Sequence, residues 1–431
     1  MKIAIAGYGQ EGKANFEYWN RPENEVTIVD EREQLGELPQ GVTTILGEGA
    51  FSRLTDFDMV VRTAGLNPAK IVTNGKVWSS TNEFFAKCPA PIIGVTGTKG
   101  KGTTCSMIAS MLRTAGKNVH LVGNIGVPAL SELKSIQASD IVVFELSSFQ
   151  LWDIEKSPHL AAILRVEQDH LDVHEGMEDY VTAKAQITRY MSANEIVYYH
   201  PTSENSRIAA QMYHTASTKR YAIKDDGAVY VQDGDFKKND EIICSVDVVQ
   251  IPGEHNIENA CAAISVVLDI TNDFLAVAEG LQSFTGLEHR LKFIREVDGV
   301  KFYDDSYSSA PPATIAAVRA FSTPQVVLIG GYDRNISFTD LANEVKNSSV
   351  KLALLFGQTR HKLADAFIEA GIDAERFQVI ESTKMNEIVS VARQVAVSGD
   401  VVIFSPACAS FDMFKNFTDR GKQFISEVNS L

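Results

Sequence analysis

Short apolar runs rich in valine and isoleucine recur along the chain, and amphipathic helical stretches separate them. The runs are almost continuously apolar rather than alternating, which is typical of parallel strands buried on both faces of a sheet. Strands that alternate with helices over most of a chain predict α/β architecture. The runs occupy residues 2–6, 26–30, 59–63, 91–97, 141–146, 160–166, 195–199, 325–331, 351–357 and 400–406.

One segment departs from this pattern. Residues 219–251 alternate apolar and polar side chains, with Asp-Gly pairs at 226–227 and 233–234. Alternation around Asp-Gly is typical of hairpins, because both turn residues then adopt positive φ. We therefore predict a hairpin or meander here, as a small antiparallel edge.

Two breaks divide the chain. Residues 87–91 contain two prolines ahead of a new strand, and residues 284–288 separate a helix from a fresh strand run. A length of 431 residues, at ~150 residues per domain, is compatible with three domains. We expect their boundaries at 1–88, 89–286 and 287–431.

Charge and cysteine content exclude several classes of protein. The net charge of −15 provides no basic field for nucleic acid or for an anionic membrane. The five cysteines are odd in number and scattered, which argues against a disulfide framework or a zinc ribbon. The amino terminus enters a strand without a signal sequence, and no apolar run approaches ~18 residues. We expect a cytoplasmic protein without nucleic-acid or membrane partners.

The first glycine motif follows the first strand. Gly7, Gly9 and Gly12 match G-x-G-x-x-G at the start of a helix, and Asp30 ends the next strand. Such a turn lets backbone amides approach a diphosphate at a helix N-terminus. The motif indicates nucleotide or dinucleotide binding, and close packing of strand on helix is the alternative.

A second, more specific loop spans residues 94–104, GVTGTKGKGTT, between a strand and a helix. Its glycines and Lys101 predict a phosphate cradle, in which amides hold the oxygens and the ammonium bridges the β and γ phosphates. Gly102 stands where such loops usually carry Ser or Thr. A hydroxyl for Mg²⁺ must then come from Thr103 or Thr104.

Three further groups follow strands in the middle of the chain. Glu145 ends a buried strand, where a carboxylate is costly unless it meets a cation, so we predict a Mg²⁺ ligand, with a salt-bridged or solvated strand end as the alternative. Residues 169–174, DHLDVH, could bind metal or move protons, or lie solvated on a loop. Lys184 by its spacing alone is a solvated helix lysine. Asn256 and Asn259 share one helix face and could read a base edge or cap the helix.

The last third of the chain has polar residues at a junction and at strand ends. Residues 286–290, GLEHR, lie at a domain boundary, where ligands often bind. Three strand ends, at 304–306, 330–334 and 405–410, continue into polar loops. This convergence predicts a second binding face.

The order of these motifs resembles the Mur ligases. The resemblance runs from Gly7 to Gly421 and implies three α/β domains: a Rossmann-like UDP-binding domain, a central P-loop ATPase and a Rossmann-like C-terminal domain. Its most specific part is SPACASFDMFKNFTDRG at 405–421. The other parts are GTKGK (97–101), ELSSFQL (145–151), DHLDVH (169–174), HNIENA (255–260), GLEHR (286–290), DDS (304–306) and GGYD (330–333).

The resemblance implies a reaction, its substrates and its ions. ATP would phosphorylate the carboxylate of UDP-N-acetylmuramoyl-L-alanine, and the amine of D-glutamate would attack the acyl phosphate. Two Mg²⁺ ions are implied, with Glu145 bridging them, Thr103 on the first and His170 on the second. Lys184 matches a family lysine that is carbamylated, which would make it a second-metal ligand. A cytoplasmic monomer is expected.

The family's remaining site positions carry over residue by residue. Lys101, Glu145, His170 and Lys184 are the implied catalytic group. The ATP positions are Gly97, Thr98, Lys99, Gly100, Lys101, Gly102, Thr103, Thr104, Asn256, Asn259, Arg290 and Asp305. The UDP-substrate positions are Gly7, Gly9, Gly12, Asp30, Glu31, Arg32, Asn124 and Ser147. The amino-acid positions are His289, Ser309, Arg334, Ser410 and Phe417.

The chain departs from the family at four positions. Arg165 stands for an asparagine, Tyr307 for a lysine, Ser309 for a threonine and Arg334 for the lysine that pairs with the glutamate side chain. These departures leave open a Mur-type ligase for another amino acid. Two further alternatives have other grounds: a ligase like folylpolyglutamate synthase, whose phosphate loop also reads GTxGKG, and an NAD-dependent dehydrogenase, suggested by the first glycine motif and Asp30 alone. A nucleotide-gated binding module is the non-enzymatic alternative.

Overall fold

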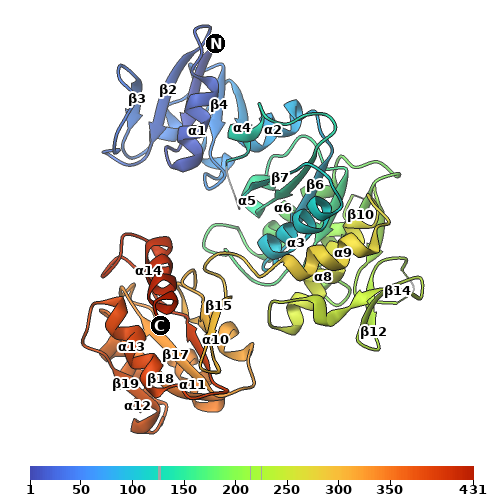
Figure 1. Ribbon diagram of the computed structural model, residues 1–431. Helices are drawn as coiled ribbons and strands as arrows, with labels where there is room; N and C mark the ends of the chain where they lie inside the picture. The colour runs from blue at the N-terminus through green and yellow to red at the C-terminus, as the bar shows by residue number, and fades with distance from the viewer. Residues whose placement is uncertain (125–127, 214, 225) are drawn as a thin grey trace. The chain divides into compact units, whose positions relative to one another are not determined.

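The computed structural model describes residues 1–124, 128–213, 215–224 and 226–431 (Figure 1). The chain forms two compact units. The first comprises Met1–Val248 with Ile257–Ser283, and the second comprises Val249–Asn256 with Phe284–Leu431. The α/β class is confirmed, while the division into three domains at 88 and 286 stays a prediction. Among the described residues, no helix is both long and apolar enough to cross a bilayer.

The first sheet of the first unit is entirely parallel, with strand order β3-β2-β1-β4-β5. Its order reverses between β1 and β4, so a crevice for a ligand is expected outside the carboxyl ends of these two strands. The glycine motif and the loop after β4 lie at those ends. The elements are β1 (Lys2–Ala6), α1 (Gln10–Trp19), β2 (Glu25–Asp30), β3 (Thr43–Leu46), β4 (Met59–Arg62), β5 (Lys76–Ser79) and α2 (Ser80–Lys87), with 3-10 turns η1 (Ala50–Ser52) and η2 (Pro68–Lys70).

The second sheet is also parallel, in the order β11-β10-β9-β6-β8-β7. Strand β6 lies at its centre, between β9 and β8, so the phosphate loop that follows β6 opens beside the ends of both neighbours. The strands are β6 (Ile92–Thr96), β7 (Val119–Gly123), β8 (Ile141–Glu145), β9 (Leu160–Ile163), β10 (Ile196–Tyr199) and β11 (Ser217–Arg220).

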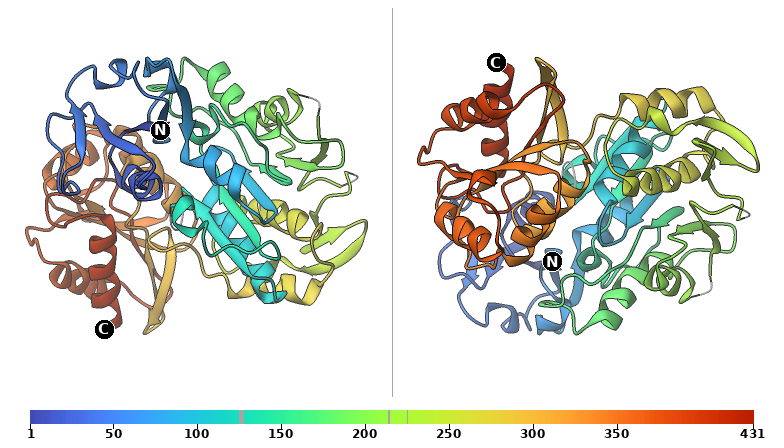
Figure 2. Two further views of the ribbon diagram at one scale, coloured as in Figure 1. Left: turned by 90° about the horizontal axis from the view of Figure 1, so that it is seen from above. Right: turned by 90° about the horizontal axis from the view of Figure 1, so that it is seen from below.

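Helices lie along this sheet, with α3 and α9 side by side (Figures 1 and 2). Gly280 on α9 permits this approach, because a Cβ there would come within 2.5 Å of the Met111 backbone on α3. The helices are α3 (Lys101–Thr114), α4 (Ala129–Glu132), α5 (Ser148–Leu151), α6 (Met177–Ala185), η3 (Gln186–Thr188), α7 (Glu204–Gln211), η4 (Val246–Val248), α8 (Glu254–Val267) and α9 (Phe274–Ser283).

The predicted antiparallel element is present, but as a sheet of its own. Strands β12 (Tyr230–Gln232), β13 (Asp235–Lys238) and β14 (Glu241–Ser245) form a meander. Asp233 and Gly234 connect β12 to β13 with φ of 56° and 81°, as a two-residue hairpin turn requires. The prediction of an edge was wrong because β11, parallel to β10, already forms that edge of the large sheet.

The second unit contains a sheet in the order β15-β16-β20-β17-β18-β19, parallel except for the β15–β16 hairpin. Both faces are covered, with α10, α11 and α12 packing on one apolar core and α13 and α14 on another. The elements are β15 (Lys292–Val297), β16 (Val300–Asp304), α10 (Pro311–Arg319), β17 (Gln325–Gly330), α11 (Thr339–Asn347), β18 (Val350–Phe356), α12 (Arg360–Glu369), η5 (Ala374–Arg376), β19 (Phe377–Val379), α13 (Met385–Val395), β20 (Val401–Phe404) and α14 (Phe417–Asn429).

Candidate active site

The phosphate loop between β6 and α3 needs its glycines for space as well as conformation. Gly97 has a φ of +147°, and a Cβ there would lie 2.7 Å from the Leu164 side chain. Gly100 has a φ of +83°, and its Cβ would lie 2.5 Å from Oδ1 of Asn259. Only glycine fits both positions without displacing a neighbour. Asn259, predicted on the adenine side, therefore lies directly against the loop.

Two lysines converge on one carbonyl of this loop. Nζ of Lys184 donates to the Gly97 oxygen at 2.7 Å, and Nζ of Lys101 donates to the same oxygen at 3.2 Å and to that of Thr98 at 3.0 Å. Lys184 also lies over the ring of Tyr180, with Nζ 4.5 Å from its centre. Spacing alone indicated a solvated lysine, but Lys184 is 1% exposed, because α6 turns it toward the loop.

Burial and the neighbouring Lys101 charge lower the pKa of Lys184 well below its ordinary value. Desolvation is the larger cause, because an ammonium group loses its hydration in the interior. The charges of Asp169 and Glu145 act in the opposite direction. Burial therefore favours the neutral amine at this position more than it does for an exposed lysine.

Glu145 ends β8 and is 3% exposed. Nδ2 of Asn124 donates to its Oε1 at 3.4 Å, so the predicted substrate position and the predicted metal ligand are adjacent. In the described part of the chain, the buried Oγ1 atoms of Thr96 and Thr104 have no hydrogen-bond partner. Thr103, by contrast, is partly exposed.

These groups fit Mg²⁺ bound together with a nucleotide. Residues 1–124, 128–213, 215–224 and 226–431 contain no cluster of three or more His, Cys, Asp or Glu side chains that could hold an ion alone. Mg²⁺ usually takes only one or two protein carboxylates, and phosphates and waters complete its shell. A buried carboxylate and an unsatisfied threonine hydroxyl beside a phosphate loop match that donor set.

The two histidines of DHLDVH differ in environment. His170 has a φ of 54° and a half-exposed ring, with Nε2 3.6 Å from Asp169 Oδ2. The ring of His174 is fully buried, and its nitrogens contact Asp179 at 2.7 Å and Ser148 Oγ at 3.0 Å. His174 is thus occupied within the fold, and only His170 has a side chain open to a ligand.

Ser147, predicted on the substrate side, caps the short helix α5. Its Oγ accepts from the Gln150 amide at 3.2 Å, and Oε1 of the Gln150 side chain accepts from the Ser147 amide at 2.9 Å. This capping box holds the turn that directly follows Glu145. Ser147 therefore stabilises the backbone of the turn beside Glu145, and its contact with the substrate stays a prediction.

The first glycine motif opens onto a cavity of about 340 Å³. Gly12 is required for packing, since a Cβ there would come within 2.0 Å of the Gly7 oxygen. Asp30 accepts from the Tyr8 amide at 2.8 Å and pairs with Arg32 at 2.7 Å, and mainly the bond to Arg32 lowers its pKa to about 2. Glu31 is exposed beside it. The cavity is lined by Tyr8, Gly9, Gln10, Lys13, Arg32, Leu35, Gly36 and Glu37.

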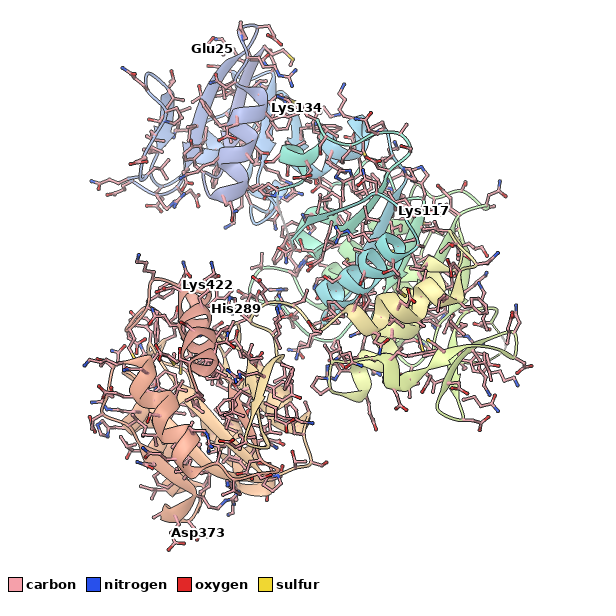
Figure 3. The ribbon with its side chains drawn as sticks, viewed as in Figure 1. Glu25, Lys117, Lys134, His289, Asp373 and Lys422 are labelled. Carbon is pink, nitrogen blue, oxygen red and sulfur yellow. The ribbon has the colours of Figure 1, made fainter. Side chains whose placement is uncertain are left out.

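In the second unit, His289 is buried against Asp304, with Nδ1 2.6 Å from the carboxylate, and against α14 (Figure 3). Its Nε2 has no hydrogen-bond partner among the described residues. The guanidinium of Arg290 lies 4.0 Å from the ring centre of Tyr307, whose ring meets that of Phe417 at 5.1 Å. The predicted ATP and amino-acid positions of this unit therefore adjoin through Tyr307.

Asp305 points into the second unit. It is 6% exposed and accepts from Ser308 at 2.5 Å, Ser405 at 2.6 Å and the Leu291 amide at 3.0 Å. Burial raises its pKa to about 7, against the lowering effect of these bonds. Its carboxylate is thus occupied by its own unit, and its predicted contact with ATP stays a prediction.

The three polar strand ends do lie together, because β16, β20 and β17 are consecutive in the sheet. Tyr332 and Ala409 also form a bridge between two of the loops. Around it, Ser410 is buried, Arg334 is exposed and Ser309 is partly exposed. On helix α8, Asn256 donates to the Pro252 oxygen at 2.6 Å. The ligands of Asn256, Ser309, Arg334 and Ser410 stay predictions.

Two residues near the site were not anticipated from the sequence. The hydroxyl of Tyr180 lies 3.1 Å from Thr98 Oγ1, and its ring supports Lys184. Its position four residues before Lys184, on the same helix face, was a usable signal. Arg62 carried no such signal, since its main partner lies 91 residues away.

Two family models match this chain: the Mur ligase middle domain over residues 95–267, and the Mur ligase, glutamate ligase domain over residues 289–408. The UDP-N-acetylmuramoylalanine–D-glutamate ligase of Acetivibrio thermocellus is 38% identical over 456 residues, covering 100% of this chain and 96% of that protein. The protein of the same name from Clostridium tetani is 35% identical over 449 residues, covering 100% and 97%.

Among solved structures, the UDP-N-acetylmuramate-alanine ligase MurC of Thermotoga maritima matches with a TM-score of 0.62 and 18% identity, covering 100% of this chain and 99% of that one. This likeness concerns the fold alone. The chain belongs to the Mur ligase family, and it is a ligase. Within that family, the full-length relatives named above are UDP-N-acetylmuramoylalanine–D-glutamate ligases. Neither a dehydrogenase nor a folylpolyglutamate synthase is favoured.

Proposed function

We propose that this ligase joins D-glutamate to UDP-N-acetylmuramoyl-L-alanine at the expense of ATP, in the synthesis of a peptidoglycan precursor. The observation that carries the proposal is the convergence of Lys101 and Lys184 on the Gly97 carbonyl, where the charge of the buried Glu145 carboxylate acts on Lys184. The names of the full-length relatives support the choice of substrates.

The chemistry proceeds in two balanced steps. An oxygen of the substrate carboxylate attacks the γ-phosphorus of ATP, and the bond to ADP breaks with its electron pair leaving on ADP. The amine of D-glutamate then attacks the acyl carbon, the carbon–oxygen bond breaks and phosphate leaves, while the amine loses a proton. Phosphoryl transfer of this kind depends on positioning and charge neutralisation, which the loop amides and Lys101 provide.

Two Mg²⁺ ions belong to the proposal, and they would neutralise phosphate charge when bound. Glu145 would hold both, Thr103 or Thr104 the first, and His170 the second. The buried, unsatisfied hydroxyl of Thr104 favours it over the partly exposed Thr103. Burial favours the neutral form of the Lys184 amine. This amine would add CO₂ and lose a proton to become a carbamate ligand.

The remaining assignments are proposals of the same kind. The cavity beside Gly9 and Arg32 would take the uridine end of the substrate, since Lys13 adds a positive charge beside the Arg32–Asp30 pair. The loops after β16, β17 and β20 would take the amino acid, with the Arg334 guanidinium on a carboxylate. We also propose a cytoplasmic monomer that binds neither nucleic acid nor membrane.

An oxygen-labelling experiment tests the reaction. The substrate's carboxylate is labelled with ¹⁸O, and the enzyme is supplied with ATP, Mg²⁺ and each member of a panel of D- and L-amino acids. We expect ADP release only with D-glutamate, and one labelled oxygen in the phosphate released. Turnover with another amino acid would refute the substrate, and unlabelled phosphate would refute the acyl phosphate.

A further inference from the structure

Arg62 ends β4 with a guanidinium that is completely buried. A buried charge is strongly unfavourable unless it is paired and its donors are all used. Nε donates to Oδ2 of Asp153 at 2.7 Å, and Nη2 contacts the other oxygen of the same carboxylate. The pair is therefore bidentate, the geometry in which an arginine binds a carboxylate most firmly.

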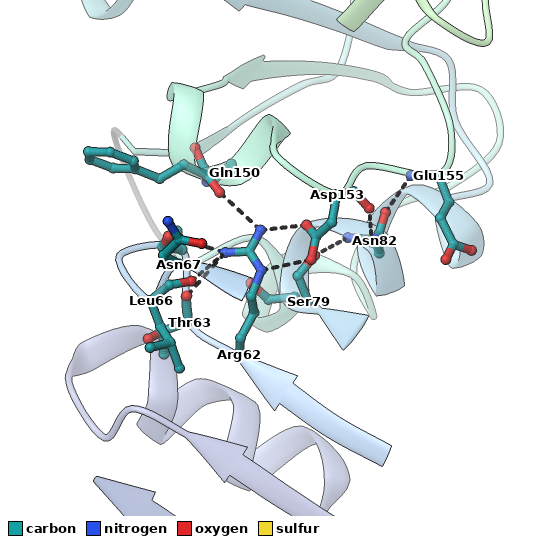
Figure 4. A network of polar contacts seen from close by, with 12 residues as sticks. Arg62, Thr63, Leu66, Asn67, Ser79, Asn82, Gln150, Asp153 and Glu155 are labelled. Carbon is teal, nitrogen blue, oxygen red and sulfur yellow. Dashed lines mark hydrogen bonds and ion pairs between the residues drawn. The ribbon is translucent and has the colours of Figure 1, made fainter. Parts of the chain in front are cut away.

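The donors that remain bind backbone carbonyls on two separate segments (Figure 4). Nη1 donates to the oxygens of Thr63, Ala64 and Leu66 at 3.2–3.3 Å, just after β4. Nη2 donates to the oxygen of Phe149 in α5 at 3.0 Å. One side chain thus ties the loop after β4 to the turn after β8.

Each of these segments adjoins a different part of the proposed site. The Thr63 side chain packs against Gly7 of the first glycine motif, and the Ala64 amide donates to Glu11 at 2.9 Å. On the other side, α5 directly follows Glu145, and the Phe149 ring lies 4.9 Å from that of His170. Arg62 therefore connects the UDP end with the end where phosphate is transferred.

We propose that Arg62 is a positioning residue, which fixes the spacing between the loop that holds the UDP end of the substrate and the turn that follows Glu145. The inference rests on the proposed function. A substrate that spans both sheets must present its carboxylate to ATP at one distance, and a displacement of about 1 Å costs on the order of 100-fold in rate. Arg62 supplies that constraint through its pairing with Asp153.

Other contacts also join the two sheets, so we expect them to stay together when Arg62 is changed. Asn82 donates to the Asp153 carbonyl at 2.8 Å and accepts from the Glu155 amide at 2.8 Å. Lys76 pairs with Glu155 at 3.1 Å, with both side chains about half exposed. The Lys76–Glu155 pair joins the same two sheets as Arg62–Asp153 but is solvated, so it provides a matched control.

The test compares Arg62→Met, Arg62→Lys and Asp153→Asn with Lys76→Met in the full-length protein. For the first three we expect kcat/KM for the UDP substrate to fall on the order of 100-fold, while affinity for an ATP analogue in the absence of that substrate is unchanged. Lysine does not rescue, because one ammonium cannot bind both segments. Lys76→Met stays within about fivefold of the wild type, as expected for an exposed pair.

Hydrogen exchange separates this inference from the proposed function, since it needs no turnover. In Arg62→Met and in Asp153→Asn, amides of residues 63–66 and of residues 147–151 should both exchange faster, and in Lys76→Met neither should. Faster exchange in one segment alone would overturn the inference. An equal loss of ATP-analogue affinity would also overturn it, as would wild-type kcat/KM for the UDP substrate in an otherwise active enzyme.

Discussion

The buried carboxylate of Asp305 should make the second unit less stable as pH rises, and Asp305→Asn should remove that dependence. The folded-state pKa of about 7 lies above the ordinary value of 3.8, mainly because the interior cannot solvate the charge. Between these two values the folded chain holds a proton that the unfolded chain releases. The contribution of Asp305 to stability is therefore fully present below about pH 4 and is lost as pH rises through about 7.

The size of the effect follows from the shift. At ~1.4 kcal/mol for each pKa unit, raising the pKa from 3.8 to about 7 is equivalent to about 4 kcal/mol in total. Between about pH 5 and about pH 8 the second unit should lose on the order of 2.5 kcal/mol of stability, which corresponds to nearly two of these pKa units. Asparagine has no such titration, although it must rearrange its bonds to Ser308 and Ser405.

The assay must report on the second unit. All three tryptophans, at 19, 78 and 152, lie in the first unit, so tryptophan fluorescence would not detect its unfolding. Hydrogen exchange of the β16 and β20 amides is measured in wild type and in Asp305→Asn at each pH. The intrinsic pH dependence of exchange is the same in both proteins, so it cancels in the comparison. We expect protection of the variant to improve relative to wild type as pH rises from about 5 to about 8. A difference that stays constant with pH would refute the reasoning.

Three further predictions concern the first unit. Gly100→Ala should raise the KM for ATP on the order of tenfold or more, because the new methyl group meets Asn259. Gly116→Ala is its control, since Gly116 has a φ of +74° but open space around it. An equal rise of KM in both variants would show that backbone strain, and not the contact with Asn259, is the cause. Glu145→Gln should lower the rate of ADP release by ~10²–10³-fold, and a rate near wild type would remove this carboxylate from the mechanism. Lys184→Ala should be inactive and partly restored by a short carboxylic acid, measured as phosphate release; failure of rescue would count against the carbamate.

Local pattern was sufficient for much of the fold and for part of the site. Parallel strands could be predicted because residues buried on both faces leave near-continuous apolar runs. Lys101 and Glu145 could be placed because a glycine loop and a strand end are defined by neighbours in sequence. The separate meander was mistaken for an edge because the strand that occupies that edge, β11, reads STKR and has no apolar run.

The environment of single side chains could not be predicted in this way. Lys184 has the spacing of a solvated helix lysine, yet it is buried beside a carbonyl 87 residues away. His174 belongs to a polar motif, yet its ring is enclosed by Ser148 and Asp179. In both cases burial depends on which segments pack together, and no window of sequence contains that information.

The sequence by itself determined the α/β class, the positions of both glycine loops and the ordered motifs of a Mur ligase, since each depends on residues close together in the chain. The tertiary structure alone decided that two lysine side chains share the Gly97 carbonyl, that burial raises the pKa of Asp305 to about 7, and that Arg62 joins two loops through Asp153. Each of these results depends on desolvation and on partners distant in sequence, because a charge changes its behaviour only where the fold excludes water and supplies a specific neighbour.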